Sequence, residues 1–168
     1  MYYAQMRKHD IANGPGIRAT LFISGCTHNC RNCFNKEYQN FKYGKAFNKA
    51  AQDEFISFAK DEHVVGISIL GGEPFQQNPE EFTNFLNRLY EEVKKPIWVW
   101  TGYLYENIPM VYKEALTYID TIIDGPFIEE LKDLKLFYRG SSNQRVIDNL
   151  ETLNNNKIIK KIIKEELS

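Results

Sequence analysis

Short apolar segments of strand length alternate with amphipathic helical segments along most of this chain, and this alternation limits the possible folds more than any other feature. Strands are expected at residues 17–24, 64–70, 97–101, 119–124 and 144–147. Helices are expected at about residues 48–62, 78–93 and 109–118. Strands that alternate with helices form right-handed βαβ units around a mainly parallel sheet. The sequence therefore predicts an α/β fold.

The number of strands predicts an incomplete barrel. A full eight-stranded (β/α) barrel typically takes ~250 residues, whereas this chain has 168. We expect a partial (β/α) barrel with an open sheet and a reduced number of strands, formed by residues 1–150. Residues 151–168 are expected to form a lysine-rich amphipathic helical tail. Its apolar face would consist of Ile158, Ile159, Ile162, Ile163 and Leu167.

Composition excludes several classes of protein. Lys and Arg number 21 against 22 Asp and Glu, a net charge of −1, whereas nucleic-acid-binding domains usually carry a strong basic excess. Apolar runs are shorter than the ~20 residues that a membrane span needs. Residues 1–8 lack the apolar core of a secretion signal. We therefore expect a cytoplasmic protein that binds neither nucleic acid nor membrane.

The three cysteines of the chain, Cys26, Cys30 and Cys33, lie within eight residues. An odd number in so short a segment cannot form a disulfide framework. Thiolates select zinc, copper(I) or iron–sulfur clusters. Structural zinc normally takes four protein ligands, and His28 inside the loop is the available fourth. A four-iron cluster usually takes four cysteines, so three would leave one iron open for chemistry.

A third interpretation is that the three cysteines are buried structural residues, since free cysteine often behaves as a small hydrophobe. The residues between and beside them are Thr, His, Asn and Arg. This polar composition is not typical of a core and favours a role in ligand binding.

The spacing Cys-x3-Cys-x2-Cys followed by Phe34 resembles the signature of radical S-adenosylmethionine (SAM) enzymes. The segment Gly71-Gly72-Glu73-Pro74, placed after an apolar strand, is similar to their SAM-binding motif. The resemblance implies a 4Fe-4S cluster whose open iron binds SAM, with Cys26, Cys30 and Cys33 as cluster ligands and catalytic residues. It also implies a set of cofactor-binding residues at the ends of the strands. These are Asn32, Cys33, Phe34, Gly71, Gly72, Glu73, Pro74, Thr101, Asp124 and Asn143.

Four further segments narrow the resemblance to the activating proteins of glycyl radical enzymes, and within them to those of anaerobic (class III) ribonucleoside-triphosphate reductase. They are residues 13–18, 97–103, 124–127 and 139–145. The resemblance implies an oxidoreductase that takes one electron from flavodoxin or a similar donor. It would cleave SAM and generate a glycyl radical on the large subunit of the reductase.

Several roles stay open from the residues alone. Asp124 is a candidate for ribose hydroxyls, for a monovalent cation near the SAM carboxylate, or for a simple turn. Arg139 and Arg145 are candidates to pair with carboxylates. The alternative functions are a radical SAM enzyme acting on a small molecule, such as a 7-deazaguanine-type synthase, and a zinc-stabilised binding module.

Overall fold

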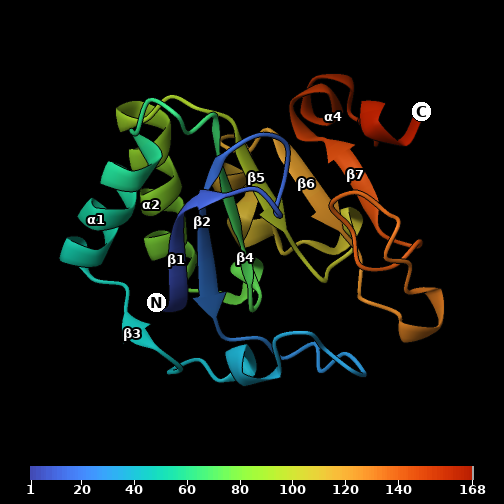
Figure 1. Ribbon diagram of the computed structural model, residues 1–168, viewed down its shortest axis with the longest axis horizontal. Helices are drawn as coiled ribbons and strands as arrows, with labels where there is room; N and C mark the ends of the chain where they lie inside the picture. The colour runs from blue at the N-terminus through green and yellow to red at the C-terminus, as the bar shows by residue number, and fades with distance from the viewer. Residues whose placement is uncertain (168) are drawn as a thin grey trace.

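The computed structural model describes residues 1–167 and consists of one sheet with helices packed against it (Figure 1). The strands are β1 (Tyr2–Asp10), β2 (Arg18–Ser24), β3 (Lys45–Ala46), β4 (Gly66–Gly71), β5 (Ile97–Trp100), β6 (Thr121–Asp124) and β7 (Arg145–Asp148). The α-helices are α1 (Lys49–Ala59), α2 (Pro79–Glu92), α3 (Lys113–Leu116) and α4 (Asn149–Asn155). Short 3-10 turns form at Lys36–Gln39, Pro74–Gln76, Tyr105–Asn107, Met110–Tyr112, Glu129–Leu131 and Lys164–Leu167.

The seven strands form one mixed sheet in the order β3-β1-β2-β4-β5-β6-β7. The four middle strands, β2, β4, β5 and β6, run parallel, whereas β1, β3 and β7 pair antiparallel at the two sides. The predicted α/β class is therefore confirmed. The sheet has more strands than the sequence predicts, because β1 and β3 were not expected.

Two of the predicted helix starts are fixed by asparagine caps. The Asn48 side chain accepts a hydrogen bond from the backbone N–H of Ala51 at the start of α1. Asn78 does the same for Glu81 in α2, where Pro79 occupies the first turn. These caps satisfy N–H groups that a helix leaves unpaired at its first turn. Both starts lie where the sequence places them.

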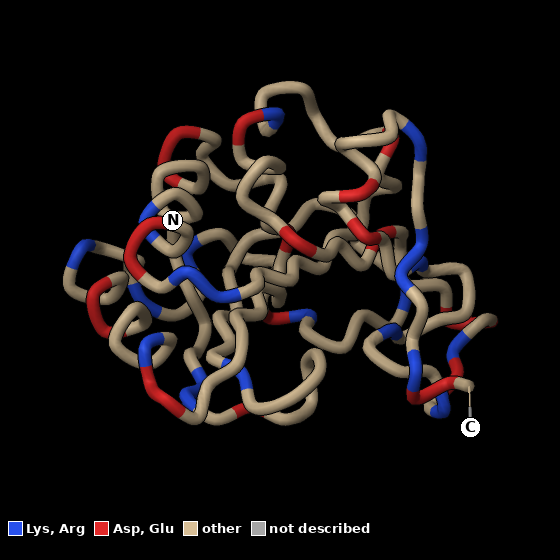
Figure 2. The backbone as a smooth tube through the Cα atoms, turned by 90° about the horizontal axis from the view of Figure 1, so that it is seen from above, with Lys and Arg blue, Asp and Glu red and all other residues tan. Residues whose placement is uncertain are grey.

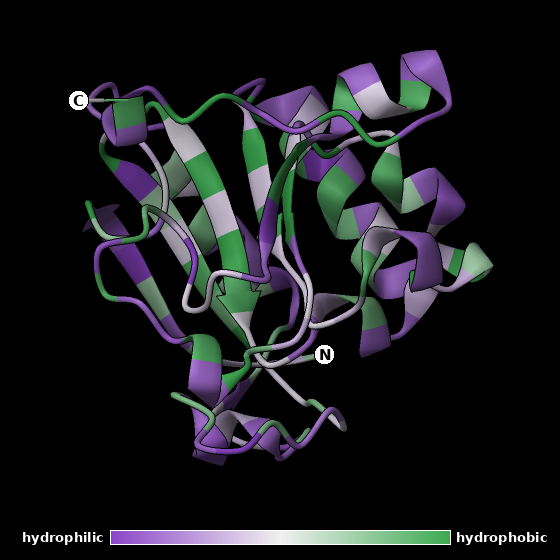
Figure 3. Ribbon diagram, turned by 90° about the vertical axis from the view of Figure 1, so that its right-hand side faces the viewer, coloured by the Kyte–Doolittle hydropathy of each residue, from purple (hydrophilic) through white to green (hydrophobic). Residues whose placement is uncertain are grey.

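The main core lies between the sheet and helices α1, α2 and α3. Leu21 of β2 and Ile67 of β4 are fully buried there, together with Phe55 of α1 and Phe85 of α2. Successive side chains of a strand point to opposite faces of the sheet, and the hydropathy of the strands alternates along the ribbon in Figure 3. Trp98 belongs to this opposite face, which carries a second, smaller apolar cluster.

The C-terminal tail does not form the amphipathic helix that the sequence predicts. Residues 157–163 are not helical and lie along β7. The Asp148 N–H donates to the Ile159 carbonyl, and the Lys161 N–H donates to the Val146 carbonyl, both at 2.8 Å. The unpaired N–H and C=O groups of an edge strand form a template for pairing with another extended segment. That pairing, and the β preference of isoleucine, outweighs the helical spacing.

The tail also covers part of the opposite face of the sheet. Ile163 is 9% exposed and packs in the second cluster with Trp98, Ile123 and Val146. Its neighbour Ile162 is 74% exposed. The tail therefore buries a single isoleucine at this point, where a helix would have buried a stripe.

Acidic and basic residues are both distributed over the whole tube in Figure 2, in keeping with the near-neutral net charge. Within residues 1–167, the helices are all too short or too polar to cross a bilayer.

Candidate functional site

The cysteine loop and the Gly-Gly-Glu-Pro turn meet at the carboxyl edge of the parallel strands, as predicted. In Figure 1 the loop that follows β2 runs along the lower side of the molecule, beyond the ends of β2 and β4. The Gly72 N–H donates to the Ile23 carbonyl at 2.6 Å, and the Glu73 N–H donates to the Gly25 carbonyl at 2.7 Å. A Cβ atom at Gly72 would lie 2.6 Å from the Gly25 carbonyl oxygen. Only glycine permits this close approach of the two turns.

The cysteine loop is held mainly through its backbone. The Cys26 N–H donates to the Gln39 carbonyl at 3.1 Å, and the Cys33 N–H donates to the Cys30 carbonyl at 3.2 Å. Asn29 and Asn32 both adopt left-handed conformations, with φ of 53° and 54°, which asparagine tolerates better than most residues. The three cysteines are unpaired and partly exposed. The loop therefore holds three free, partly exposed cysteines.

Burial raises the pKa of the Cys26 thiol to about 11. A hydrogen bond from the backbone N–H of His28 acts in the opposite direction, while the nearby carboxylate of Glu73 adds to the rise. A ligated thiol must lose its proton. Cation binding would therefore release a proton from Cys26 at neutral pH.

The donor chemistry of the three thiols fits an iron–sulfur cluster. Within residues 1–167, no three side chains of His, Cys, Asp or Glu converge on one point, as tetrahedral zinc would require. In a four-iron cluster each cysteine binds a separate iron, so the three sulfurs need not converge. Soft thiolates are also the ligands that such clusters prefer. The donor set therefore fits the cluster that the sequence predicts.

Glu73 accepts hydrogen bonds from several segments at this edge of the sheet. Its side chain is 1% exposed. One carboxylate oxygen accepts from the Thr101 hydroxyl at 2.7 Å and from the Phe75 N–H at 3.0 Å. The other accepts from the Gly102 N–H at 2.7 Å and from Nε2 of His28 at 2.9 Å. Glu73 thus joins the ends of β4 and β5 to the cysteine loop.

Two other predicted site residues lie beside the cysteine loop. Phe34 is 60% exposed and packs against Phe127, with ring centroids 4.8 Å apart. Asn143 donates to the Pro126 carbonyl at 2.8 Å. Its side-chain oxygen is buried and has no hydrogen-bond partner among residues 1–167. A buried acceptor without a donor is rare, so this oxygen is suited to accept from a bound molecule.

Asp124 has different partners from those the sequence suggests. It is fully buried at the end of β6, where its carboxylate accepts from Arg145 and from the Tyr105 N–H at 2.8 Å. Arg145 also pairs with Glu106 at 2.9 Å. These contacts tie Asp124 to the loop after β5 and to the start of β7, so its carboxylate supports those two segments. Arg145 is engaged in the same network.

Arg139 pairs with Glu166 of the C-terminal tail. Its Nε is buried and lacks a hydrogen-bond partner within the described residues. The tail was not expected to contact the predicted site loops, and this ion pair brings it there.

Sequence reasoning missed the residues that anchor the cysteine loop from the side of β4. Gln76 accepts from the Thr27 N–H at 2.8 Å and donates to the Thr27 hydroxyl at 2.9 Å. The same amide donates to the Tyr103 hydroxyl at 3.2 Å. His28 was considered only as a metal ligand, whereas its ring binds Glu73. A glutamine two residues beyond a Gly-Gly-Glu-Pro turn carried no signal of this kind.

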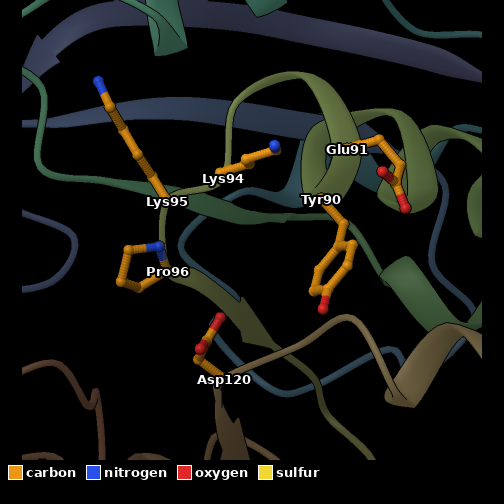
Figure 4. A pocket seen from close by; sticks show the side chains of 6 residues that line it. All are labelled: Tyr90, Glu91, Lys94, Lys95, Pro96 and Asp120. Atoms are coloured by element: carbon orange, nitrogen blue, oxygen red, sulfur yellow. The ribbon is translucent and has the colours of Figure 1, made fainter.

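A separate pocket of about 560 Å³ lies at the opposite, amino-terminal edge of the sheet. Figure 4 shows Tyr90 and Asp120 facing its open space, with Lys94, Lys95 and Pro96 along one side. Its lining residues Pro96 and Asp120 directly precede β5 and β6. The length of these strands therefore separates the pocket from the cysteine loop. This pocket is therefore not part of the candidate cluster site.

Comparison with known proteins agrees with this geometry. The family model described as 4Fe-4S single cluster domain matches residues 12–147. The anaerobic ribonucleoside-triphosphate reductase-activating protein of Escherichia coli (strain K12) is 41% identical over 150 residues, covering 87% of this chain and 97% of that relative. The protein of the same description from Haemophilus influenzae is 40% identical over 148 residues, covering 86% and 96%.

A phage protein shows the same likeness. The anaerobic ribonucleoside-triphosphate reductase-activating protein of Enterobacteria phage T4 is 37% identical over 153 residues, covering 90% of this chain and 96% of the relative. Matches of this extent span the cysteine loop, the glycine turn and nearly the whole sheet. The chain therefore belongs to the 4Fe-4S single cluster domain family and, within it, to the anaerobic ribonucleoside-triphosphate reductase-activating proteins.

Proposed function

We propose that this chain is a radical SAM enzyme that generates a glycyl radical on the large subunit of an anaerobic ribonucleoside-triphosphate reductase. One observation carries the proposal. The cysteine loop and the 71–74 turn are hydrogen-bonded to each other at the carboxyl edge of the sheet, in a chain that belongs to the reductase-activating family. Sites of parallel sheets gather at this edge.

In the proposed site, Cys26, Cys30 and Cys33 hold the 4Fe-4S cluster and leave one iron open. When bound, the cluster would supply the one-electron reductive cleavage of SAM that leads to a glycyl radical on the reductase, with the electron coming from flavodoxin or a similar donor. The low reduction potential that this cleavage needs depends on hydrogen bonds to the sulfurs and on exposure. The partly exposed loop leaves the cluster accessible to a donor protein.

We assign SAM to the space beside the cysteine loop. In this assignment Asn32, Phe34 and the 71–74 turn would contact SAM, together with Thr101, whose hydroxyl is held by Glu73. Gly72 lets the 71–74 turn pack directly on the backbone of Gly25, which brings the turn close to the cysteine loop. The unpartnered side-chain oxygen of Asn143 is suited to accept from a hydroxyl or amino group. In this assignment the sheet is the wall of a partial barrel, and its opposite face looks toward the cofactor.

A macromolecular substrate is supported by the exposed apolar side chains of the β6–β7 loop. Leu131, Leu134 and Phe137 are 42%, 87% and 39% exposed, and Phe34 of the cysteine loop is 60% exposed. Exposed apolar patches commonly mark contacts with another protein. An open rim of this kind would admit a loop of the reductase.

The test is anaerobic electron paramagnetic resonance of the reconstituted, reduced protein with SAM and the reductase large subunit from the same organism. We expect a glycyl radical doublet that is absent with Cys30→Ala. A reduced-cluster signal that SAM perturbs, without a doublet, would keep the cofactor chemistry and overturn the reductase as substrate. A full cluster content in Cys30→Ala would overturn the ligand assignment.

A further inference from the structure

His28 is the side chain of the cysteine loop that reaches into the buried interior of the site. It lies between Cys26 and Cys30, and its Nε2 is 2.9 Å from the Glu73 carboxylate. The carboxylate already accepts from three other donors, so the His28 ring must carry its proton at Nε2 to complete the set. The side chain of His28 is 19% exposed and that of Glu73 is 1% exposed. Water therefore offers the buried carboxylate little compensation if His28 leaves.

The His28 ring is also held by packing. It meets the Tyr103 ring edge to face, with centroids 4.6 Å apart. On its other side it touches the backbone of Gly102, where a Cβ atom would lie 2.7 Å from the ring carbon Cδ2. Tyr103 is itself tied to the loop, because its hydroxyl accepts from Gln76. The ring is therefore fixed by one hydrogen bond and two contacts.

Fixing the ring also fixes the backbone of His28. The backbone N–H of His28 lies close enough to the Cys26 sulfur to oppose the rise in the pKa of that thiol. Hydrogen bonds to the sulfurs help to set the reduction potential of iron–sulfur clusters. Residues that orient ligands in this way typically affect metal affinity or activity about 10- to 100-fold when they are changed. A side chain that holds this N–H in place can thus act on the cluster without touching it.

We propose that His28 is a positioning residue. Its attachment to Glu73 and Tyr103 fixes the segment between Cys26 and Cys30 against the ends of β4 and β5, and so controls how firmly the loop retains the cluster and how readily the cluster accepts an electron. This inference rests on the proposed assignment of the three cysteines as cluster ligands.

The experiment compares His28→Ala, His28→Gln and a matched control, His63→Ala, in the reconstituted full-length protein under anaerobic conditions. His63 is 67% exposed and pairs with Asp61, away from the cysteine loop. Two quantities are measured: the rate at which a chelator bleaches the cluster absorbance, and the midpoint potential of the cluster from a redox titration.

We expect His28→Ala to lose its cluster about 10- to 100-fold faster than the parent. Its midpoint potential should shift to a more negative value, because a hydrogen bond to sulfur stabilises the reduced, more negative cluster. His28→Gln can place an N–H donor near the position of Nε2 and should restore part of both properties. His63→Ala should match the parent in both.

Gly102→Ala disturbs the same contact from the other side and leaves His28 itself unchanged. The added Cβ would push against the ring, so we expect a shift in the same direction as in His28→Ala. This variant also serves as the test if His28→Ala fails to fold. Circular dichroism of the cluster-free variants reports their thermal unfolding.

A purely structural role would lower the unfolding temperature of cluster-free His28→Ala and leave the midpoint potential of the loaded protein unchanged. That result, or parental bleaching rates in both His28→Ala and Gly102→Ala, would overturn the inference. The proposed function would survive it, provided that Cys26→Ala, Cys30→Ala and Cys33→Ala still fail to assemble a cluster. If those variants do assemble one, the ligand assignment fails first.

Discussion

Two buried charged side chains lie at opposite edges of the parallel part of the sheet, and they contact different parts of the molecule. Glu73 follows β4 at the carboxyl edge, and Arg18 begins β2 at the amino edge, where it is 2% exposed. Arg18 donates to the Ser68 hydroxyl at 2.8 Å, the Ile67 carbonyl at 2.9 Å and the Pro15 carbonyl at 3.1 Å. Among residues 1–167 it forms no ion pair with a carboxylate. Burial lowers its pKa to about 10.

The comparison separates a charge that serves the fold from one that serves the site. Burying a charge costs free energy unless hydrogen bonds replace its water, and both residues meet that requirement with several hydrogen bonds. The partners of Arg18 belong to β4 and to the turn before β2, and its guanidinium stacks on Trp98 at 5.2 Å. The partners of Glu73 include the cysteine loop through His28. Losing Arg18 should therefore affect stability, and losing Glu73 should affect stability and the cluster together.

The largest effect on stability is expected for Arg18→Met. Methionine fills much of the space but removes the three hydrogen bonds that the guanidinium donates, and a hydrogen bond of a charged group is worth about 1.5–3 kcal/mol. We expect the free energy of unfolding of the cluster-free protein, measured in urea, to fall by about 3 kcal/mol. The control Arg31→Met removes an 81% exposed arginine and should cost less than about 0.5 kcal/mol. A changed midpoint potential of the cluster in Arg18→Met would contradict the expectation that Arg18 affects stability alone.

A smaller loss of stability is expected for Glu73→Gln. The amide keeps one acceptor oxygen but turns an NH2 group toward donors that the carboxylate now satisfies, at Gly102 and His28. Hydrogen bonds to a charged group are worth about 1.5–3 kcal/mol, so we expect a loss of about 2 kcal/mol in urea unfolding. Unlike Arg18→Met, this variant should also lose its cluster faster to a chelator. If a chelator bleached the cluster at the same rate in Arg18→Met and Glu73→Gln, the result would contradict the view that Glu73 supports the cluster and Arg18 does not.

The C-terminal tail supports the Arg18 end of the molecule, because Trp98 contacts both. Lys161 lies 5.3 Å from the Trp98 ring, and Ile163 packs in the same cluster. Ile163→Ala should cost about 2 kcal/mol of unfolding free energy, at the lower end for buried isoleucine since the cluster is small. Tryptophan fluorescence should shift to longer wavelength as Trp98 gains water. The neighbouring control Ile162→Ala, 74% exposed in the parent, should leave both quantities nearly unchanged.

The smallest effect is a pH dependence at the Arg18 end. Burial on its own would raise the pKa of Asp10, but hydrogen bonds from the Asn13 side chain and the Ala12 N–H lower it overall, below its usual value of 3.8. Stability from Asp10 is therefore fully present above that value and is lost as the pH falls through the lower, folded-state pKa. Urea unfolding of Asp10→Asn should show a shallower loss of stability on acidification than the parent. Glu54→Gln, at an exposed position, should follow the parental curve, and an equally shallow curve there would contradict the assignment.

The elements that were predicted correctly are those marked by signals within a short stretch of the sequence. The caps at Asn48 and Asn78 fix helix starts through contacts within four residues, so the sequence contains all that is needed to place them. The strand that precedes the cysteine loop is an apolar run that the sequence also contains. In contrast, β1 shows no clear apolar run, and its pairing with β2 depends on a partner beyond its own segment.

The C-terminal tail shows that a local sequence pattern can also predict an element that does not form. Its isoleucines at helical spacing predict a helix, and the prediction is wrong because the unpaired side of β7 offers hydrogen bonds that a local pattern cannot reveal. Asp124 was correctly placed at the end of a strand, but its pairing with Arg145 depends on the antiparallel return of β7. Neither contact has a short-range signal.

The sequence by itself determined the chemistry of this protein: three thiols at a spacing that suits an iron–sulfur cluster, a glycine turn after a buried strand, and an alternation that requires a parallel sheet. These are properties of residue type and spacing, which the unfolded chain already has. The tertiary structure decided which groups support that chemistry. Glu73 could gather His28, Thr101 and Gly102 only after β2, β4 and β5 had aligned their carboxyl ends, because hydrogen bonds between distant segments form only when the sheet brings them together.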